Sequence, residues 1–290
     1  MMELLNKAAA SDIPILIEGE SGTGKNTVAQ YIHQSGNRCG APFVTVDCAT
    51  LTENQFEQDF FGQNVPGRSE KNTKTQGILD RANGGTLFLN DISGLSDRLQ
   101  AKISSLLETD IYSYTESANT QKTDIRIIAS CATDLLKQVE TGHFRKDLYY
   151  RLAHFPITLP TLRKRREDIP LLSEFFLKQF SDIANPKKLS DIACYELQCY
   201  AFPGNIRELK NIIERACLLC NDTNILVEHL QLPQKAKAPI APGKALPVFE
   251  DASTLLAHFK GNRKDLAEHL GISERTLYRK LAKLKENPTV

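Results

Sequence analysis

Residues 19–27, GESGTGKNT, combine closely spaced glycines with a lysine and follow the apolar run IPILIE. Gly19, Gly22 and Gly24 let the backbone turn its N–H groups toward an anion at the start of a helix. Lys25 is placed to reach the terminal phosphates of a nucleotide. The spacing matches the Walker A pattern in its strand–loop–helix context, so we predict a phosphate-binding loop. Its expected contacts are Gly19, Glu20, Ser21, Gly22, Thr23, Gly24, Lys25, Asn26 and Thr27.

A second polar pair ends the apolar run of residues 84–91, GGTLFLND. Nucleotide-hydrolysing proteins place an acid at the end of such a buried strand to hold magnesium. Here Asn90 keeps an oxygen ligand but carries no charge, and Asp91 follows it. Asn26 also stands where a Ser or Thr usually touches the metal ion. We therefore expect ATP or another nucleotide to bind, with magnesium held weakly through Asn90 and Asp91 or not at all.

The cysteine content favours reduced thiols, because seven is an odd number and the chain is not a small, cysteine-dense scaffold. The spacing of Cys194, Cys199, Cys217 and Cys220 leaves a zinc site as an alternative. However, the segment ERACLLC has an apolar helical face, where cysteine acts as a small hydrophobe. A net charge of +1 and the lack of any apolar run near 20 residues predict a cytoplasmic protein without a membrane partner.

The order of apolar runs predicts three structural units. From Ile13 to Ala132, short apolar runs alternate with helical patterns, which indicates βαβ units and a parallel sheet. Residues 161–232 carry helical spacing throughout. Residues 233–249 are rich in Pro, Ala and Lys, which is typical of a linker, and residues 250–290 form the last unit.

The last unit has the pattern of a helix-turn-helix. Gly271 turns the chain and Ser273 is a good N-cap for a helix that buries Leu277, Leu281 and Leu284. Residues 260–285 contain eight basic and three acidic residues, a local charge of +5 that suits DNA phosphates. A purely structural three-helix bundle is the alternative. The expected DNA contacts are Ser273, Glu274, Arg275, Thr276, Tyr278, Arg279 and Lys280, with Arg275 and Arg279 foremost.

Taken together, the motifs resemble the AAA+ activators of sigma-54 RNA polymerase, also called bacterial enhancer-binding proteins. The segments that carry the resemblance are GESGTGK, FVTVDC, GGTLFLND, IRIIAS, FRKDLYYRL, FPITLPTLRKRREDIP and FPGNIRELKN, in the order of that family. The resemblance implies an α/β AAA+ P-loop core with a parallel sheet over residues 1–160. It also implies a helical lid over 161–232 and a Fis-type helix-turn-helix over 250–290. The family's usual N-terminal receiver or sensor domain is not part of this sequence.

The resemblance also assigns roles to three arginines. Arg145 and Arg151 match the family's arginine fingers, which reach the γ-phosphate on a neighbouring subunit. Arg207 matches the second sensor on the lid. The alternatives are surface ion pairs for Arg145 and Arg151 and a helix-end contact for Arg207.

Three features depart from the family pattern. Where the family has two acids at the end of its second strand, this chain has Asn90 and Asp91. The family's sensor asparagine falls on Ala132. Its sigma-contacting loop, with the consensus GAFTGA, should lie between residues 61 and 77, where this chain is polar and basic. Loss of one well-placed catalytic group typically costs about 100–1000-fold in rate, so we expect residual or absent ATPase activity.

We therefore predict a DNA-binding transcriptional regulator whose AAA+ core mediates ligand-dependent self-association, as a dimer or a ring. Its expected partners are double-stranded DNA and RNA polymerase, without remodelling of the sigma-54 form. One alternative is an active ATPase that opens sigma-54 promoters, and another is an oligomerisation module with a vestigial pocket. Some divergent relatives respond to cyclic di-GMP, and the side chains available for a second phosphate are Gln30, Arg68, Lys71 and Lys74.

Overall fold

The computed structural model describes residues 2–50, 59–65, 73–109, 111–113, 120–132, 134–182 and 185–233. The chain divides into two compact units, Met1–Thr161 and Leu162–Val290. The predicted helix-turn-helix and its DNA contacts lie outside the described residues, as does the predicted linker beyond Pro233.

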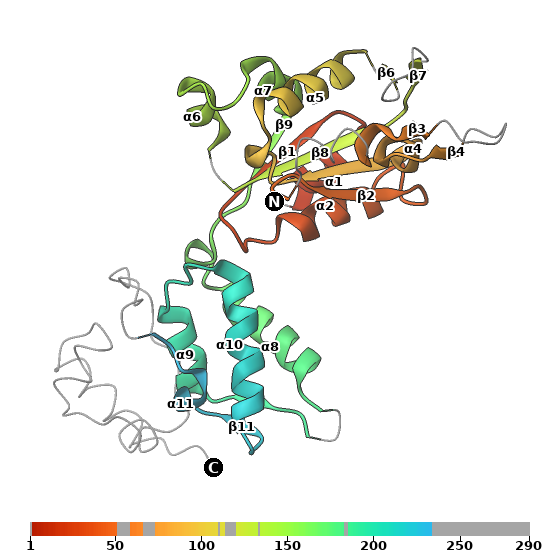
Figure 1. Ribbon diagram of the computed structural model, residues 1–290. Coiled ribbons are helices and arrows are strands. Elements are labelled where there is room, and N and C mark those ends of the chain that lie inside the picture. Colours follow the sequence, from red (N-terminus) through yellow and green to blue (C-terminus); the bar gives the residue numbers. More distant parts are fainter. Residues whose placement is uncertain are drawn as a thin grey trace, which may run out of the picture. The chain divides into compact units, whose positions relative to one another are not determined.

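Unit 1 is built on a five-stranded sheet in which all neighbouring strands pair in parallel (Figure 1). The strand order is β2-β5-β8-β1-β9. The strands are β1 (Ile15–Glu18), β2 (Phe43–Asp47), β5 (Thr86–Asn90), β8 (Arg126–Cys131) and β9 (Phe155–Thr158). The α/β class and the parallel sheet predicted from the sequence are confirmed.

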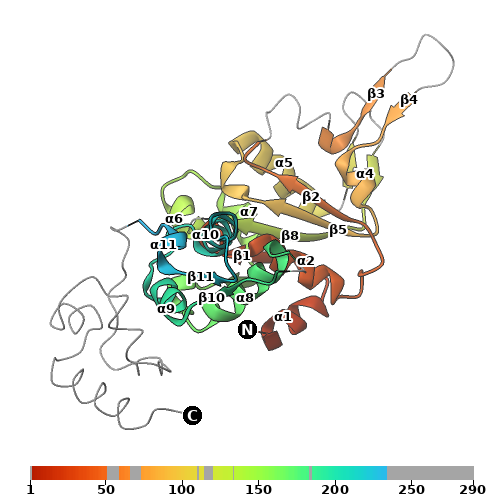
Figure 2. The ribbon, with the colours of Figure 1, turned by 90° about the horizontal axis from the view of Figure 1, so that it is seen from below.

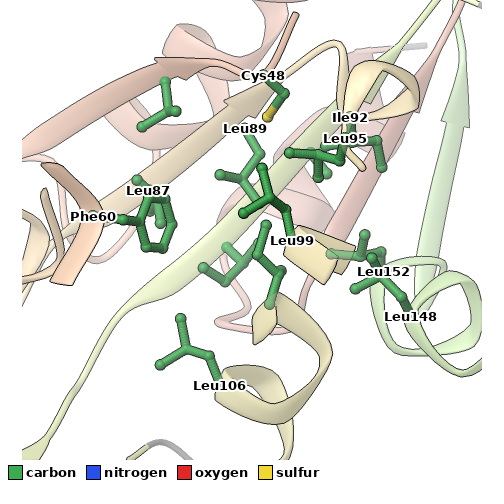
Figure 3. Packing of buried hydrophobic residues seen from close by; sticks show 14 of the residues in the cluster. Cys48, Phe60, Leu87, Leu89, Ile92, Leu95, Leu99, Leu106, Leu148 and Leu152 are labelled. Atoms are coloured by element: carbon green, nitrogen blue, oxygen red, sulfur yellow. The ribbon is translucent and has the colours of Figure 1, made fainter. Parts of the chain in front are cut away.

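Helices cover both faces of this sheet, which explains why the central strands are apolar along their length rather than alternating. The helices are α1 (Met2–Ala9), α2 (Lys25–Gln34), α4 (Ile78–Ala82), α5 (Asp97–Thr109), α6 (Leu135–Glu140) and α7 (Lys146–Leu152), with a 3₁₀ turn η1 (Ile92–Gly94). α1 and α2 pack on the face that carries Ile15 and Ile17. α5 and α7 pack on the opposite face, where Leu99 and Leu148 belong to the same apolar cluster as Leu89 (Figure 3).

Two antiparallel hairpins extend the unit beyond the sheet. One pairs β3 (Gln63–Val65) with β4 (Thr73–Thr75), and it points away from the sheet in Figure 2. The other pairs β6 (Ile111–Ser113) with β7 (Thr120–Lys122). The first hairpin occupies the region where the sigma-contacting loop was expected. Of the four side chains proposed for a second phosphate, those of Arg68, Lys71 and Lys74 lie outside the described part of the structure.

A buried arginine joins α1 to the sheet. Arg126 opens β8 and is only 1% exposed. Its guanidinium donates from Nη2 to the Ala8 carbonyl at 2.6 Å and from Nη1 to the Ala9 carbonyl at 3.3 Å. These carbonyls end α1, where the helix dipole favours a cation. Burial lowers the pKa of Arg126, while the charge of Asp12 and the two carbonyls at the helix end favour its charged form.

His33, near the end of α2, makes the stability of unit 1 depend on pH. Its ring is 5% exposed, and Nδ1 lies 3.0 Å from the Thr86 hydroxyl. Burial lowers the pKa of His33 below its ordinary value of 6.5, and the charge of Arg126 lowers it further. The unfolded chain therefore binds this proton at a higher pH than the folded chain does. The contribution of neutral His33 to stability is complete above about pH 6.5, and it is lost as the pH falls below that value.

We expect the free energy of unfolding in urea to decrease between pH 7.5 and pH 5.5. His33→Gln keeps a hydrogen-bonding group but cannot titrate, so it should remove part of this decrease. His154→Gln, at an exposed position, is the matched control and should leave the decrease unchanged. An equal pH dependence in both variants would show that His33 does not contribute.

Unit 2 is a helical bundle around one apolar core. Its elements are η2 (Leu162–Lys164), α8 (Asp168–Phe180), β10 (Lys188–Leu189), α9 (Asp191–Cys199), α10 (Asn205–Leu219), β11 (Asn224–Ile225) and α11 (Val227–Leu230). Cys217 and Cys220 belong to the core, as expected of small hydrophobes. Within the described ranges, no cluster of three or more His, Cys, Asp or Glu residues is arranged to hold a metal ion. None of the helices described is long and apolar enough to span a membrane.

Candidate nucleotide site

The segment predicted to bind phosphate joins a strand to a helix, between the end of β1 at Glu18 and the start of α2 at Lys25. Two of its glycines have positive φ angles, 79° at Gly22 and 101° at Gly24, which favour glycine over other residues. The Thr23 hydroxyl donates to the Glu20 carbonyl at 2.8 Å and closes the turn from inside. Within residues 19–24, the Gly19 and Thr23 N–H groups donate to the Cys131 and Glu20 carbonyls, and the loop leads directly into the start of α2, where helix N–H groups can meet an anion.

Lys25 points back into this loop. Its ammonium donates to the Gly19 carbonyl at 2.7 Å and to the Glu20 carbonyl at 3.2 Å. A Cβ on Gly19 would come within 3.0 Å of Thr23 Oγ1 and 3.1 Å of Leu159 Cβ, so the loop is closely packed there. Ser21, Asn26 and Thr27 are exposed, as is Gln30 further along α2. A phosphate at the loop would meet the Lys25 charge together with the N–H groups of the helix start.

Asn90 lies at the carboxyl end of β5, the same edge of the sheet that carries the loop. Its side-chain Oδ1 accepts a hydrogen bond of 2.9 Å from the Ser130 hydroxyl on β8. The same hydroxyl accepts from the Asp91 backbone N–H at 3.3 Å. Ser130 is fully buried, so this one side chain sets the orientation of both neighbouring residues. The role of Ser130 could not be predicted from the sequence, because an apolar strand gives no sign of which residue its serine contacts.

Asp91 adopts a left-handed conformation, with φ 56° and ψ 59°, that is uncommon for a residue with a side chain. Its Oδ1 accepts a hydrogen bond of 2.7 Å from the Ser93 hydroxyl. Asp47, on β2, is the register partner of Asn90. The Asp91 carboxylate therefore accepts a hydrogen bond from the Ser93 hydroxyl. The Asn90 amide oxygen accepts one from the Ser130 hydroxyl.

These contacts differ from the magnesium site of a nucleotide hydrolase at the residue that closes the strand, where a charged carboxylate is replaced by the neutral Asn90. Asn90 supplies no charge, and one lone pair of its Oδ1 is used by the Ser130 hydroxyl. Asp91 is the one carboxylate of the pair, and its Oδ1 accepts from Ser93. Thr27 and Asn26 are polar side chains at the start of α2, but neither adds a carboxylate.

Ala132 follows the last residue of β8, whose carbonyl accepts the Gly19 N–H at 3.3 Å. This contact ties the end of β8 to the first residue of the phosphate loop. Ala132 therefore lies next to the loop, but its methyl group has nothing with which to orient a water molecule.

Arg145 lies at the N-cap of α7 and binds a carboxylate of its own chain. Its Nε and Nη2 donate to the two oxygens of Asp147, both at 3.0 Å. The Arg145 guanidinium lowers the pKa of Asp147 to about 2, and a hydrogen bond from the Ser104 hydroxyl adds to this effect. Arg151, the other expected finger, lies 3.0 Å from the Glu108 carboxylate. Both arginines are partly exposed, at 45% and 32% of their side chains, so their ion pairs lie at the surface of unit 1.

Arg207 is exposed in the first turn of α10, within unit 2. The start of this helix is tightly built. Asn205 is fully buried with φ 51°, and its Oδ1 accepts the Leu162 N–H at 2.9 Å. The Glu208 carboxylate accepts from the Gly204 N–H at 2.7 Å and from the Tyr200 hydroxyl at 2.8 Å. The direction in which α10 presents Arg207 is therefore fixed with respect to the core of unit 2.

Three sequence families match successive parts of the chain. Residues 1–158 match the sigma-54 interaction domain, 163–245 the AAA+ ATPase lid domain, and 253–284 the bacterial regulatory proteins of the Fis family. The last match spans all the predicted DNA contacts, 273–280.

Curated relatives and solved structures agree with these matches. The regulatory protein AtoC of Escherichia coli is 38% identical over 97% of this chain, and the transcriptional regulatory protein ZraR of Salmonella typhimurium is 37% identical over 98%. The chain spans 65% of AtoC and 67% of ZraR.

NtrX of Brucella abortus, solved in complex with ADP, is similar over 98% of this chain and 66% of its own, with 34% identity and a TM-score of 0.72. Its complex with ATP is similar with a TM-score of 0.71. The predicted AAA+ class is thus confirmed. The chain belongs to the sigma-54 interaction domain family of AAA+ proteins, with an AAA+ lid and a Fis-family C-terminal region.

Proposed function

We propose that this chain is a DNA-binding transcriptional regulator whose AAA+ core binds ATP or ADP and hydrolyses ATP slowly or not at all. The observation that carries the proposal is the contact of Asn90 with Ser130, next to an intact phosphate loop. The groups that hold phosphate are present, whereas the groups that organise hydrolysis are changed. NtrX, a relative of known structure, was solved with ADP and with ATP, which supports a nucleotide as the ligand.

The expected loss of transition-state stabilisation is large enough to make hydrolysis slow. Removing one preorganised catalytic group typically costs about 3–4 kcal/mol of transition-state stabilisation. Asn90 lacks the charge of the expected acid, Asp91 is one methylene shorter than the expected glutamate, and Ala132 has no polar group. Even with strong non-additivity, these changes together leave turnover far below that of an ordinary ATPase.

We propose that nucleotide binding promotes self-association, as a dimer or a higher ring. Arg145 and Arg151 support this proposal, because their partly exposed ion pairs can be exchanged for a phosphate on a neighbouring copy. Sedimentation velocity with and without ATP tests it. A larger species with ATP in the natural chain, absent in Arg145→Ala/Arg151→Ala, is the expected result. No change with ATP would instead favour an oligomerisation module with a vestigial pocket.

DNA binding is proposed to reside in residues 250–290. Replacing Arg275 and Arg279 together by alanine should weaken binding of promoter DNA about 10–100-fold and lower the dependence on salt concentration. Fluorescence anisotropy at 50 and 200 mM salt measures both quantities. Lys7→Ala, an exposed position on α1, is the control for loss of charge elsewhere. Unchanged affinity in the double variant would place the DNA contacts on another surface.

A second candidate function is an active ATPase that opens sigma-54 promoters. The match of residues 1–158 to the sigma-54 interaction domain favours it, and makes RNA polymerase the proposed protein partner. We propose that remodelling is nevertheless lost, because the chain has no Phe-Thr pair between residues 61 and 77. Cyclic di-GMP is a further proposed ligand of the same core, and competition with ATP for binding would test it.

A further inference from the structure

The contact between Ser130 and Asn90 changes what the strand end can bind. An amide has an acceptor oxygen on one arm and two N–H donors on the other, in one plane. Because Ser130 donates to Oδ1, the orientation of the whole Asn90 amide is fixed. The Ser130 hydroxyl also accepts the Asp91 N–H, and its own proton is donated to Oδ1, so a flipped amide would leave that proton without this acceptor. The Nδ2 group is then the donor arm of Asn90 that a ligand can meet.

No hydrogen bond from Asn90 Nδ2 to another described residue is found, and the side chain is only half-buried. A ligand at the phosphate loop would therefore meet an N–H donor at this strand end, where a hydrolase has a carboxylate. A carboxylate repels phosphate unless a divalent cation lies between them. A neutral donor at Asn90 lowers that repulsion, with Asp91 as the carboxylate that remains in the pair, and adds a hydrogen bond to a phosphate oxygen.

We infer that this site binds its nucleotide through protein donors alone and does not need magnesium for affinity. Lys25 and the loop N–H groups hold the phosphates, and the oriented Asn90 amide supplies a further donor in place of the cation. The inference rests on the proposed nucleotide binding and specifies its metal requirement. It makes Asn90 a specificity-determining residue and Ser130 its positioning residue.

Calorimetric titration with the non-hydrolysable analogue AMP-PNP, in magnesium and in EDTA, tests this inference. The dissociation constants of the natural chain should agree within about threefold in the two buffers. Asn90→Asp should bind at least tenfold more weakly in EDTA than in magnesium, because the carboxylate then needs a cation. Ser130→Ala, which frees the amide, should weaken binding in EDTA several-fold and leave binding in magnesium within twofold.

Gln34→Glu makes the same amide-to-carboxylate change at an exposed residue at the other end of α2, and it should behave like the natural chain. If the natural chain itself loses tenfold or more in EDTA, the inference is wrong while nucleotide binding stands. If AMP-PNP fails to bind in either buffer, the proposed function is wrong as well. If Ser130→Ala matches the natural chain in both buffers, Ser130 does not position Asn90.

Discussion

Lys25→Ala should weaken the binding of AMP-PNP at least 100-fold. The Lys25 ammonium lies inside the phosphate loop, donating to the Gly19 and Glu20 carbonyls, and no other lysine or arginine belongs to residues 19–27. Removing it takes away the charge-assisted hydrogen bonds that this loop offers to phosphates, each roughly twice as strong as a neutral one. Calorimetric titration of both proteins measures the effect.

Lys7→Ala is the matched control, since Lys7 is an exposed lysine on α1, and its affinity should stay within twofold of the natural value. Thermal unfolding of Lys25→Ala without nucleotide checks that the loop still folds after losing its two internal hydrogen bonds. A folded Lys25→Ala protein that binds the analogue with natural affinity would mean that the nucleotide does not use this loop.

The paired substitution Asn90→Asp with Asp91→Glu should raise phosphate release about 100-fold. The first change restores a charge at the end of β5, and the second restores the longer side chain that polarises water. An increase of about 100-fold in the rate is what one well-placed catalytic group typically contributes. We expect no larger increase, because Ala132 still supplies no polar group. Steady-state phosphate release from ATP and magnesium measures the change.

Adding Lys25→Ala to the paired substitution is the control, because activity at this site must then disappear. A contaminating ATPase would survive that control. If the paired protein releases phosphate no faster than the natural one, then Asn90 and Asp91 are not what limits hydrolysis. Ala132 would become the next position to change.

The phosphate loop and the parallel sheet could be predicted from the sequence because their signals are local. Gly22 and Gly24 have the positive φ angles that the motif implies, and the loop joins a strand to a helix. The apolar runs of β5 and β8 are buried on both faces, as a parallel sheet requires. Periodicity and glycine spacing report backbone geometry directly, so these elements needed no knowledge of distant contacts.

The contacts of the site could not be predicted, because they join residues far apart in the chain. Ser130 reaches Asn90 across 40 positions, and Arg126 reaches α1 across more than 110. The helix α1 and the two hairpins were also missed. Their segments are short, and a helix of eight residues such as α1 relies mainly on tertiary contacts, here its apolar packing on the sheet and the hydrogen bonds from Arg126.

The most direct test of the account is the steady-state release of phosphate from ATP by the natural chain. It should be measured with magnesium and at protein concentrations high enough for rings to assemble. We predict that the natural chain releases phosphate no faster than the Lys25→Ala protein does, although the natural chain binds AMP-PNP. Turnover near 1 s⁻¹, about the low end of ordinary enzyme rates, would contradict it. The chain would then be an active ATPase, and opening of sigma-54 promoters would be the function to test.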